Sequence, residues 1–151
     1  MSDDLKQVVV FELGDEEYGV DILQVKTIER LMNITRVPKA PDFVEGVINL
    51  RGEVVPVIDL RKRFELPARE RTEDNRIIIV NIDSITVGMI VDSASEVLHL
   101  PESQIEPAPK MISGIDSDFI SGVGKINDRL LILLDLSKVL KYKEIEQLEN
   151  L

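Results

Sequence analysis

Short apolar runs separated by polar turns recur along this chain, a pattern typical of a protein built mainly of β-strands. The clearest example is the stretch 44–60, where two runs rich in β-branched residues flank the turn Leu50-Arg51-Gly52-Glu53. β-Branched residues favour strands, and glycine supplies the positive φ that a tight hairpin requires. We therefore predict a hairpin that displays Arg51 at its tip.

The same pattern occurs twice along the chain. A shift of 69 residues places the first hairpin signal on a second one, with Gly19 falling on Gly88. A shift of 76 residues places the central hairpin on the stretch 120–136, with Arg51 opposite Asn127. Two offsets that each preserve glycines and strand pairs indicate an internal duplication of two β-rich units.

Helical signals are fewer and shorter than strand signals. Asp21 can cap a helix, with Gln24 three residues later. Apolar residues then recur at helical spacing over 22–32, so we predict a helix there. Asp59 and Asp135 each stand where a strand ends, and we expect both to cap a following helix. The apolar positions within 139–148 predict an amphipathic helix near the C-terminus.

Composition and charge narrow the chemistry that the chain can support. The net charge of −10 argues against nucleic acid as the main partner, because phosphate binding needs a concentrated positive face. The chain has no cysteine and one histidine, His99. A general base works only with its proton target in reach, and the sequence gives His99 no partner. We predict no catalytic residues, no metal ligands and no cofactor.

Nothing along the chain predicts direct insertion into a membrane. The first residues, Met1-Ser2-Asp3-Asp4, lack the basic start and apolar middle of a signal peptide. No apolar run approaches the ~20 residues needed to span a bilayer. We therefore expect a cytoplasmic protein.

Five segments together form a specific signature. They are 11–23, 46–52, 56–60, 88–92 and 129–133, and the Asn-Leu-Arg-Gly turn with its flanks is specific. In these segments the chain closely resembles the CheW family of bacterial chemotaxis coupling proteins, nearly from end to end. The regulatory domain of the CheA kinase is similar, but a chain of this length has no room for kinase parts.

The resemblance implies a mostly β fold. Two small five-stranded barrels of the Src-homology-3 type would lie side by side, with short helices and a C-terminal helix. A single CheW-like domain would cover 1–151, with the first barrel at about 15–82 and the second at about 6–14 and 83–151. The first strand of each unit would be exchanged into the other barrel.

The resemblance also implies a function without catalysis. The chain would be an adaptor that couples transmembrane chemoreceptors to the chemotaxis histidine kinase CheA and is recruited to membrane-bound receptor arrays. The receptor's cytoplasmic tip would dock near the groove between the barrels, touching Val25, Thr27, Gly46, Asn49 and Arg51. The kinase regulatory domain would pair with the second barrel, around Gly88 and Gly122. One departure is Thr27, which stands where many relatives carry Glu.

Two other classes of function compete with the adaptor. A small-barrel module that binds single-stranded nucleic acid would show basic residues interleaved with exposed aromatic side chains. With 4% aromatic residues and no tryptophan, the sequence disfavours it, although a module for another protein ligand stays open. An enzyme would need turnover that one histidine and no cysteine make hard to supply.

Overall fold

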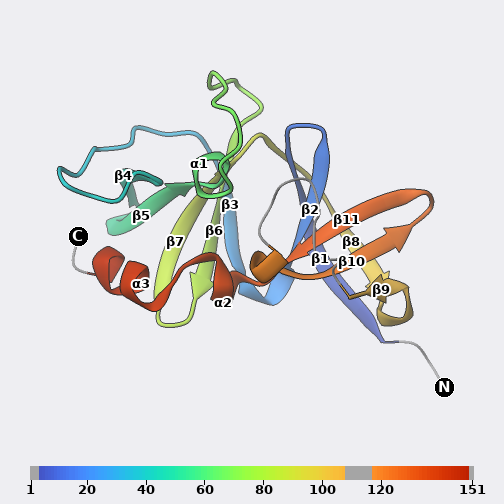
Figure 1. The fold of residues 1–151 in the computed structure, drawn as a ribbon. Helices are drawn as coiled ribbons and strands as arrows, with labels where there is room; N and C mark the ends of the chain where they lie inside the picture. The colour runs from blue at the N-terminus through green and yellow to red at the C-terminus, as the bar shows by residue number, and fades with distance from the viewer. Residues whose placement is uncertain (1–3, 108–116, 150–151) are drawn as a thin grey trace.

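The structure, a computed structural model, describes residues 4–107 and 117–149 as two β-sheets with a few short helices (Figure 1). The six-stranded sheet has the order β8-β1-β2-β11-β10-β9, and the five-stranded sheet the order β3-β6-β7-β5-β4. The strands are β1 (Leu5–Leu13), β2 (Glu16–Asp21), β3 (Val25–Arg30), β4 (Val44–Leu50), β5 (Glu53–Asp59), β6 (Arg76–Ile82), β7 (Ile85–Val91), β8 (Ser93–Pro101), β9 (Ile105–Glu106), β10 (Ile120–Ile126) and β11 (Arg129–Leu134). The α-helices are α1 (Leu60–Arg63), α2 (Leu136–Val139) and α3 (Tyr142–Glu149), and the 3-10 turns are η1 (Ile22–Gln24), η2 (Glu102–Gln104) and η3 (Ser117–Phe119).

The connection between the two edge strands closes each sheet into a small barrel. After β3 the chain pairs with β4, where the amides of Thr35 and Val47 donate to each other's carbonyl oxygens at 2.8 and 2.9 Å. In the six-stranded sheet the single turn η2 joins the edge strands β8 and β9. The mostly β fold with two small barrels side by side is confirmed, and the two-residue strand β9 makes one sheet six-stranded.

Each barrel takes one hairpin from the other half of the chain. In Figure 1 the blue hairpin β1–β2 lies beside the orange strands β10 and β11, and the hairpin β6–β7 lies beside β3 and β5. Each hairpin is attached to its barrel by a parallel strand pair, β2 with β11 and β7 with β5. The two pairs are equivalent in the repeat, with Gly19 opposite Leu133 and Gly88 opposite Val57. The exchange therefore involves both strands of each hairpin, where we expected the first strand alone. Their turns of two residues are too short to carry the second strand into another sheet.

This exchange shifts strands relative to the expected barrel bounds. Strand β2 lies in the six-stranded sheet and β7 in the five-stranded sheet. The expected bounds were about 15–82 for the first barrel, and 6–14 with 83–151 for the second. They place β2 in the first barrel and β7 in the second, which is the reverse of what the structure shows.

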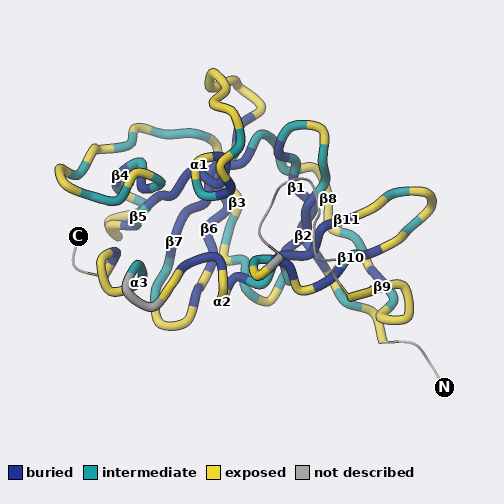
Figure 2. The backbone as a smooth tube through the Cα atoms, viewed as in Figure 1, coloured by how far each residue is buried: buried dark blue, intermediate teal, exposed yellow. Residues whose placement is uncertain are grey.

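The largest apolar core lies between the two sheets, and each barrel encloses a smaller one. Along β6, Ile78 and Val80 face the shared core, whereas Ile77 and Ile79 face the interior of the five-stranded barrel. Because both faces of β1 and β6 are covered, the stretches 8–11 and 77–80 within these strands are unbroken apolar runs. Figure 2 shows the buried stretches along the central strands and the exposed ones at the loops and hairpin ends.

The predicted caps at the strand ends are confirmed. Asp59 Oδ1 accepts from the amide of Arg61 at 2.9 Å, and Asp135 Oδ1 accepts from the amide of Ser137 at 3.1 Å. The C-terminal helix predicted across 139–148 is divided: α2 ends at Val139, Leu140 is extended, and α3 buries Ile145 and Leu148 in the shared core. Among the described residues, no helix combines the length and apolar character of a membrane span.

The helix predicted over 22–32 is wrong. Asp21 does cap a turn, accepting from the amide of Leu23 at 2.9 Å, but that turn is only the 3-10 helix η1. From Val25 the chain is the strand β3, which pairs with β6. The β-branched residues of β3 favour this extended form, and pairing with a buried strand outweighs the helical spacing.

Candidate functional site

The hairpin between β4 and β5 presents Arg51 rigidly. Arg51 and Gly52 both have positive φ, of 52° and 88°, as a two-residue turn of type I′ requires. The side chain of Asn49 holds the turn, because its Oδ1 accepts from the amide of Gly52 at 2.8 Å. The side chain of Arg51 is 71% exposed, so the predicted display of a cation at the hairpin tip is confirmed.

Arg51 reaches across the mouth of the barrel to strand β3. Its Nη1 lies 3.1 Å from Glu29 Oε1, and the hydroxyl of Thr27 donates to the same oxygen at 3.2 Å. Glu29 lies opposite Ile77 on the neighbouring strand, so its side chain projects from the barrel-interior face. We call Thr27, Glu29, Asn49 and Arg51 the hairpin-tip cluster. It links the two edge strands of the five-stranded sheet.

The other two predicted receptor residues lie in the same strands but play packing roles. Val25, on β3, is partly buried against the shared core. Gly46, on β4, has a φ of 147°, and a Cβ there would lie 2.1 Å from the carbonyl oxygen of Thr35. Gly46 therefore permits the backbone contact that closes the barrel.

The two predicted kinase residues lie in different sheets. Gly88 is buried within β7 of the five-stranded sheet, although we expected it in the second barrel, and Gly122 is buried in β10. A Cβ on Gly88 would lie 2.8 Å from Ile77 Cγ2, and one on Gly122 would lie 2.9 Å from the carbonyl oxygen of Glu106. Both glycines thus permit close packing of neighbouring strands.

A buried ion pair that the sequence did not indicate ties the β1–β2 turn to α1. Arg61 Nε donates to Asp92 Oδ1 at 2.8 Å, its Nη2 contacts Asp92 Oδ2, and the amide of Gly14 donates to Oδ2 at 2.7 Å. Burial alone would raise the pKa of the Asp92 carboxyl, but these hydrogen bonds hold that pKa below its usual range. The pair joins a turn of one barrel to the helix that follows a strand of the other.

A second arginine fixes the C-terminal helix. Arg63 donates from Nε to the carbonyl oxygen of Val139 at 2.6 Å and binds both carboxylate oxygens of Glu144 at 2.9 Å. Its guanidinium lies over the rings of Phe43 and Phe119, with Cζ at 4.9 and 5.2 Å from the two ring centroids. These contacts link α1 to both α2 and α3.

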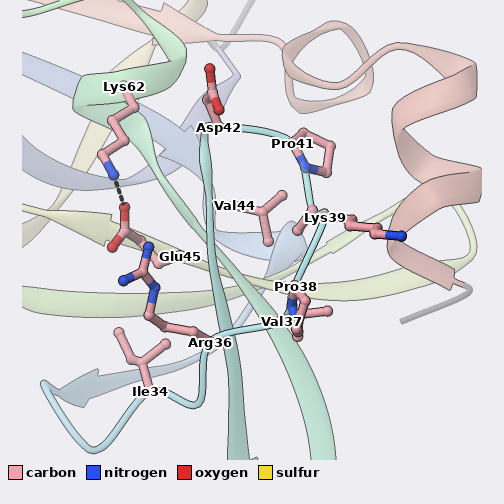
Figure 3. Close-up of a pocket in the computed structure, with 11 residues that line it drawn as sticks. Ile34, Arg36, Val37, Pro38, Lys39, Pro41, Asp42, Val44, Glu45 and Lys62 are labelled. Atoms are coloured by element: carbon pink, nitrogen blue, oxygen red, sulfur yellow. Dashed lines mark ion pairs between the residues drawn. The ribbon is translucent and has the colours of Figure 1, made fainter.

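A hollow of about 820 Å³ lies beside β4, between this strand and the loop before it (Figure 3). Its lining mixes apolar and charged side chains, and Glu45 pairs there with Lys62 at 2.6 Å. No histidine lines it. Within 4–107 and 117–149, no three His, Cys, Asp or Glu residues gather closely enough to hold a metal ion. The hairpin-tip cluster is therefore the better candidate for a site of recognition.

Sequence and structure comparisons connect the whole fold to one family. A family model described as "CheW-like domain" matches residues 7–144. The chemotaxis protein CheW of Bacillus subtilis is 44% identical over 135 residues, covering 89% of this chain and 86% of that protein. CheW of Klebsiella aerogenes is 39% identical over 145 residues, covering 96% and 87%. The crystal structure of the scaffolding protein TtCheW from Thermoanaerobacter tengcongensis superposes with a TM-score of 0.86 at 41% identity, covering 93% of this chain and 95% of that one.

Proposed function

The chain belongs to the CheW-like domain family of chemotaxis scaffold proteins, which are not enzymes, and we propose on that premise that it couples two partners. One partner is the cytoplasmic tip of transmembrane chemoreceptors, and the other is the regulatory domain of the histidine kinase CheA. By binding both, the protein acts as a cytoplasmic adaptor recruited to receptor arrays.

The observation that carries the receptor contact is the exposed guanidinium of Arg51 at the tip of a closed hairpin turn. The shape of this turn is fixed by the hydrogen bond from the amide of Gly52 to Asn49 Oδ1. A guanidinium presents five N–H donors in a planar fork, which suits carbonyl and carboxylate acceptors on a helical tip. We therefore assign the receptor contact to the β4–β5 hairpin and the adjoining strand β3, including Val25, Thr27 and Gly46.

The kinase contact is proposed around Gly88, in the five-stranded sheet, and Gly122, in the six-stranded sheet, and the charge distribution supports a separate partner for the part around Gly122. Residues 22–91, which include the five-stranded barrel, carry 11 basic and 10 acidic side chains. The rest of the chain carries 7 basic and 18 acidic side chains. Complementary potentials steer association and suppress wrong partners, so this difference in charge suits different partners for the receptor hairpin and for the surface around Gly122.

The test is a set of binding titrations with the purified full chain. A receptor-tip fragment and the kinase regulatory domain are titrated separately and then together, and we expect binding to each and a ternary complex. Arg51→Ala should weaken receptor binding by roughly 5- to 30-fold, as a contact worth about 1–2 kcal/mol would, and leave kinase binding unchanged.

Lys138→Ala is the matched control, because it removes an exposed cation from α2, outside β3 and the β4–β5 hairpin. A wild-type chain that binds neither fragment would refute the adaptor. Normal receptor binding by a folded Arg51→Ala variant would remove Arg51 from the contact.

A further inference from the structure

We propose that Glu29 is a positioning residue for the receptor contact, acting through Arg51. The proposal rests on the function proposed above and extends it to a residue that no resemblance assigned. Its basis is the contact at 3.1 Å between Glu29 Oε1 and Arg51 Nη1 across the mouth of the five-stranded barrel.

The carboxylate of Glu29 is itself held in place. Strand β3 pairs with the buried strand β6, with Glu29 opposite Ile77, and the side chain of Glu29 is only 19% exposed. The hydroxyl of Thr27, two residues earlier on the same face, donates to the oxygen that pairs with Arg51. A fixed acceptor therefore meets a cation on a flexible stem.

The pairing uses only part of the guanidinium of Arg51. Glu29 is the one described residue to which the Arg51 side chain forms an ion pair or hydrogen bond. With 71% of that side chain exposed, the remaining N–H donors face solvent and stay available to a partner. Glu29 thus orders the side chain without consuming its binding capacity.

Such ordering has a direct consequence for affinity. Binding that must immobilise a rotamer-rich side chain loses affinity, and a side chain ordered beforehand avoids that loss. Thr27, which shares this face of β3, carries no charge. Glu29 supplies the carboxylate on the same face of β3, displaced by two residues.

Three roles for Glu29 predict different outcomes when its charge is removed. As a positioning residue, Glu29→Gln weakens receptor binding alone, by about 3- to 10-fold. As an ordinary surface charge, its removal leaves binding unchanged or strengthens binding to an acidic partner. As a structural link across the barrel mouth, its removal lowers the unfolding midpoint and weakens both partners in parallel.

The experiment is a double-mutant cycle between Glu29 and Arg51 in the full chain. Dissociation constants for the receptor-tip fragment and the kinase regulatory domain are measured for Glu29→Gln, Arg51→Ala and the double variant, together with urea midpoints. We expect Glu29→Gln to weaken receptor binding about 3- to 10-fold, to leave kinase binding unchanged, and to have no further effect once Arg51 is alanine. Glu70→Gln, which changes an exposed acid outside both β3 and the β4–β5 hairpin, is the control and should bind normally.

Thr27→Glu added to Glu29→Gln should restore part of the affinity, because it returns a carboxylate to that face of β3. Normal receptor binding by folded Glu29→Gln, or an equal loss in the Arg51→Ala background, would overturn the proposal. If Glu29→Gln does not fold, Glu29→Asp keeps the charge but draws the carboxylate back. Normal receptor binding by Glu29→Asp would then refute positioning. If the wild-type chain fails to bind the receptor fragment, the proposed function itself is refuted.

Discussion

Replacing Asp92 with asparagine removes one charge from the junction of the barrels and keeps the shape of the side chain. Asp92 accepts from Arg61 through both carboxylate oxygens and from the amide of Gly14 at 2.7 Å. Asparagine offers one acceptor oxygen, and its NH₂ group would face another donor. The substitution therefore leaves Arg61, whose side chain is 9% exposed, without its counter-ion.

The expected loss of stability follows from this burial. Removing one partner of a buried ion pair typically costs about 3–5 kcal/mol, because the other charge stays buried without compensation. We expect about 3 kcal/mol, since Arg61 keeps its hydrogen bond to the carbonyl oxygen of Pro67 at 2.8 Å and Asp92 is 17% exposed. For a urea slope of about 2 kcal/mol/M, the unfolding midpoint falls by about 1.5 M.

The same substitution should change how stability depends on pH. The folded structure lowers the pKa of Asp92, so its carboxylate contributes stability above the unfolded pKa of about 3.9. That contribution is lost as the pH falls through the folded pKa. The difference in unfolding free energy between wild type and Asp92→Asn should be full at pH 7 and should shrink below about pH 4.

Urea unfolding followed by circular dichroism, at pH 7 and at pH 3.5, measures both effects. Asp42→Asn is the control, because Asp42 is exposed and has no ion pair with any described residue. A deficit at pH 7 below about 1 kcal/mol would refute the role assigned to the ion pair. A deficit of equal size at both pH values would refute the electrostatic explanation.

Two further substitutions test packing at other points of the fold. Gly88→Ala places a Cβ 2.8 Å from Ile77 Cγ2 and should lower the free energy of unfolding by about 1–3 kcal/mol, measured by urea unfolding. Unchanged stability would refute this packing role and leave Gly88 a role in the kinase contact. Arg63→Met removes the ion pair with Glu144 and should speed amide hydrogen exchange in α3 while the central strands keep their protection. Exchange that rises equally throughout the chain would show that Arg63 supports the whole fold and not the C-terminal helix.

Local features were readable from the sequence because the residues that form them are close together in the chain. The hairpin carrying Arg51 needs only its two β-branched arms and Gly52. The caps at Asp59 and Asp135 bond to amides two residues away. The repeat also indicated which strands are equivalent, since duplicated units keep their pattern wherever the strands finally pair.

The segment after Asp21 shows where local patterns mislead. Apolar spacing over 22–32 suits a helix, and in a helix Thr27 and Glu29 would point to nearly opposite sides. In the strand β3 they share one face, which is what brings Glu29 to Arg51. A site made of residues from two edge strands cannot be recognised while one of those strands is assigned to a helix.

The hairpins and their turns, the duplication, the CheW-like family and the display of Arg51 could all be read from the sequence. Only the tertiary structure decided which hairpin joins which barrel, that Glu29 is the partner of Arg51, and that Arg61 is buried against Asp92. The physical reason is that these contacts join segments far apart in the chain. Pairing between distant strands and burial at the junction of the barrels set their geometry, and neither leaves a periodic signal along the sequence.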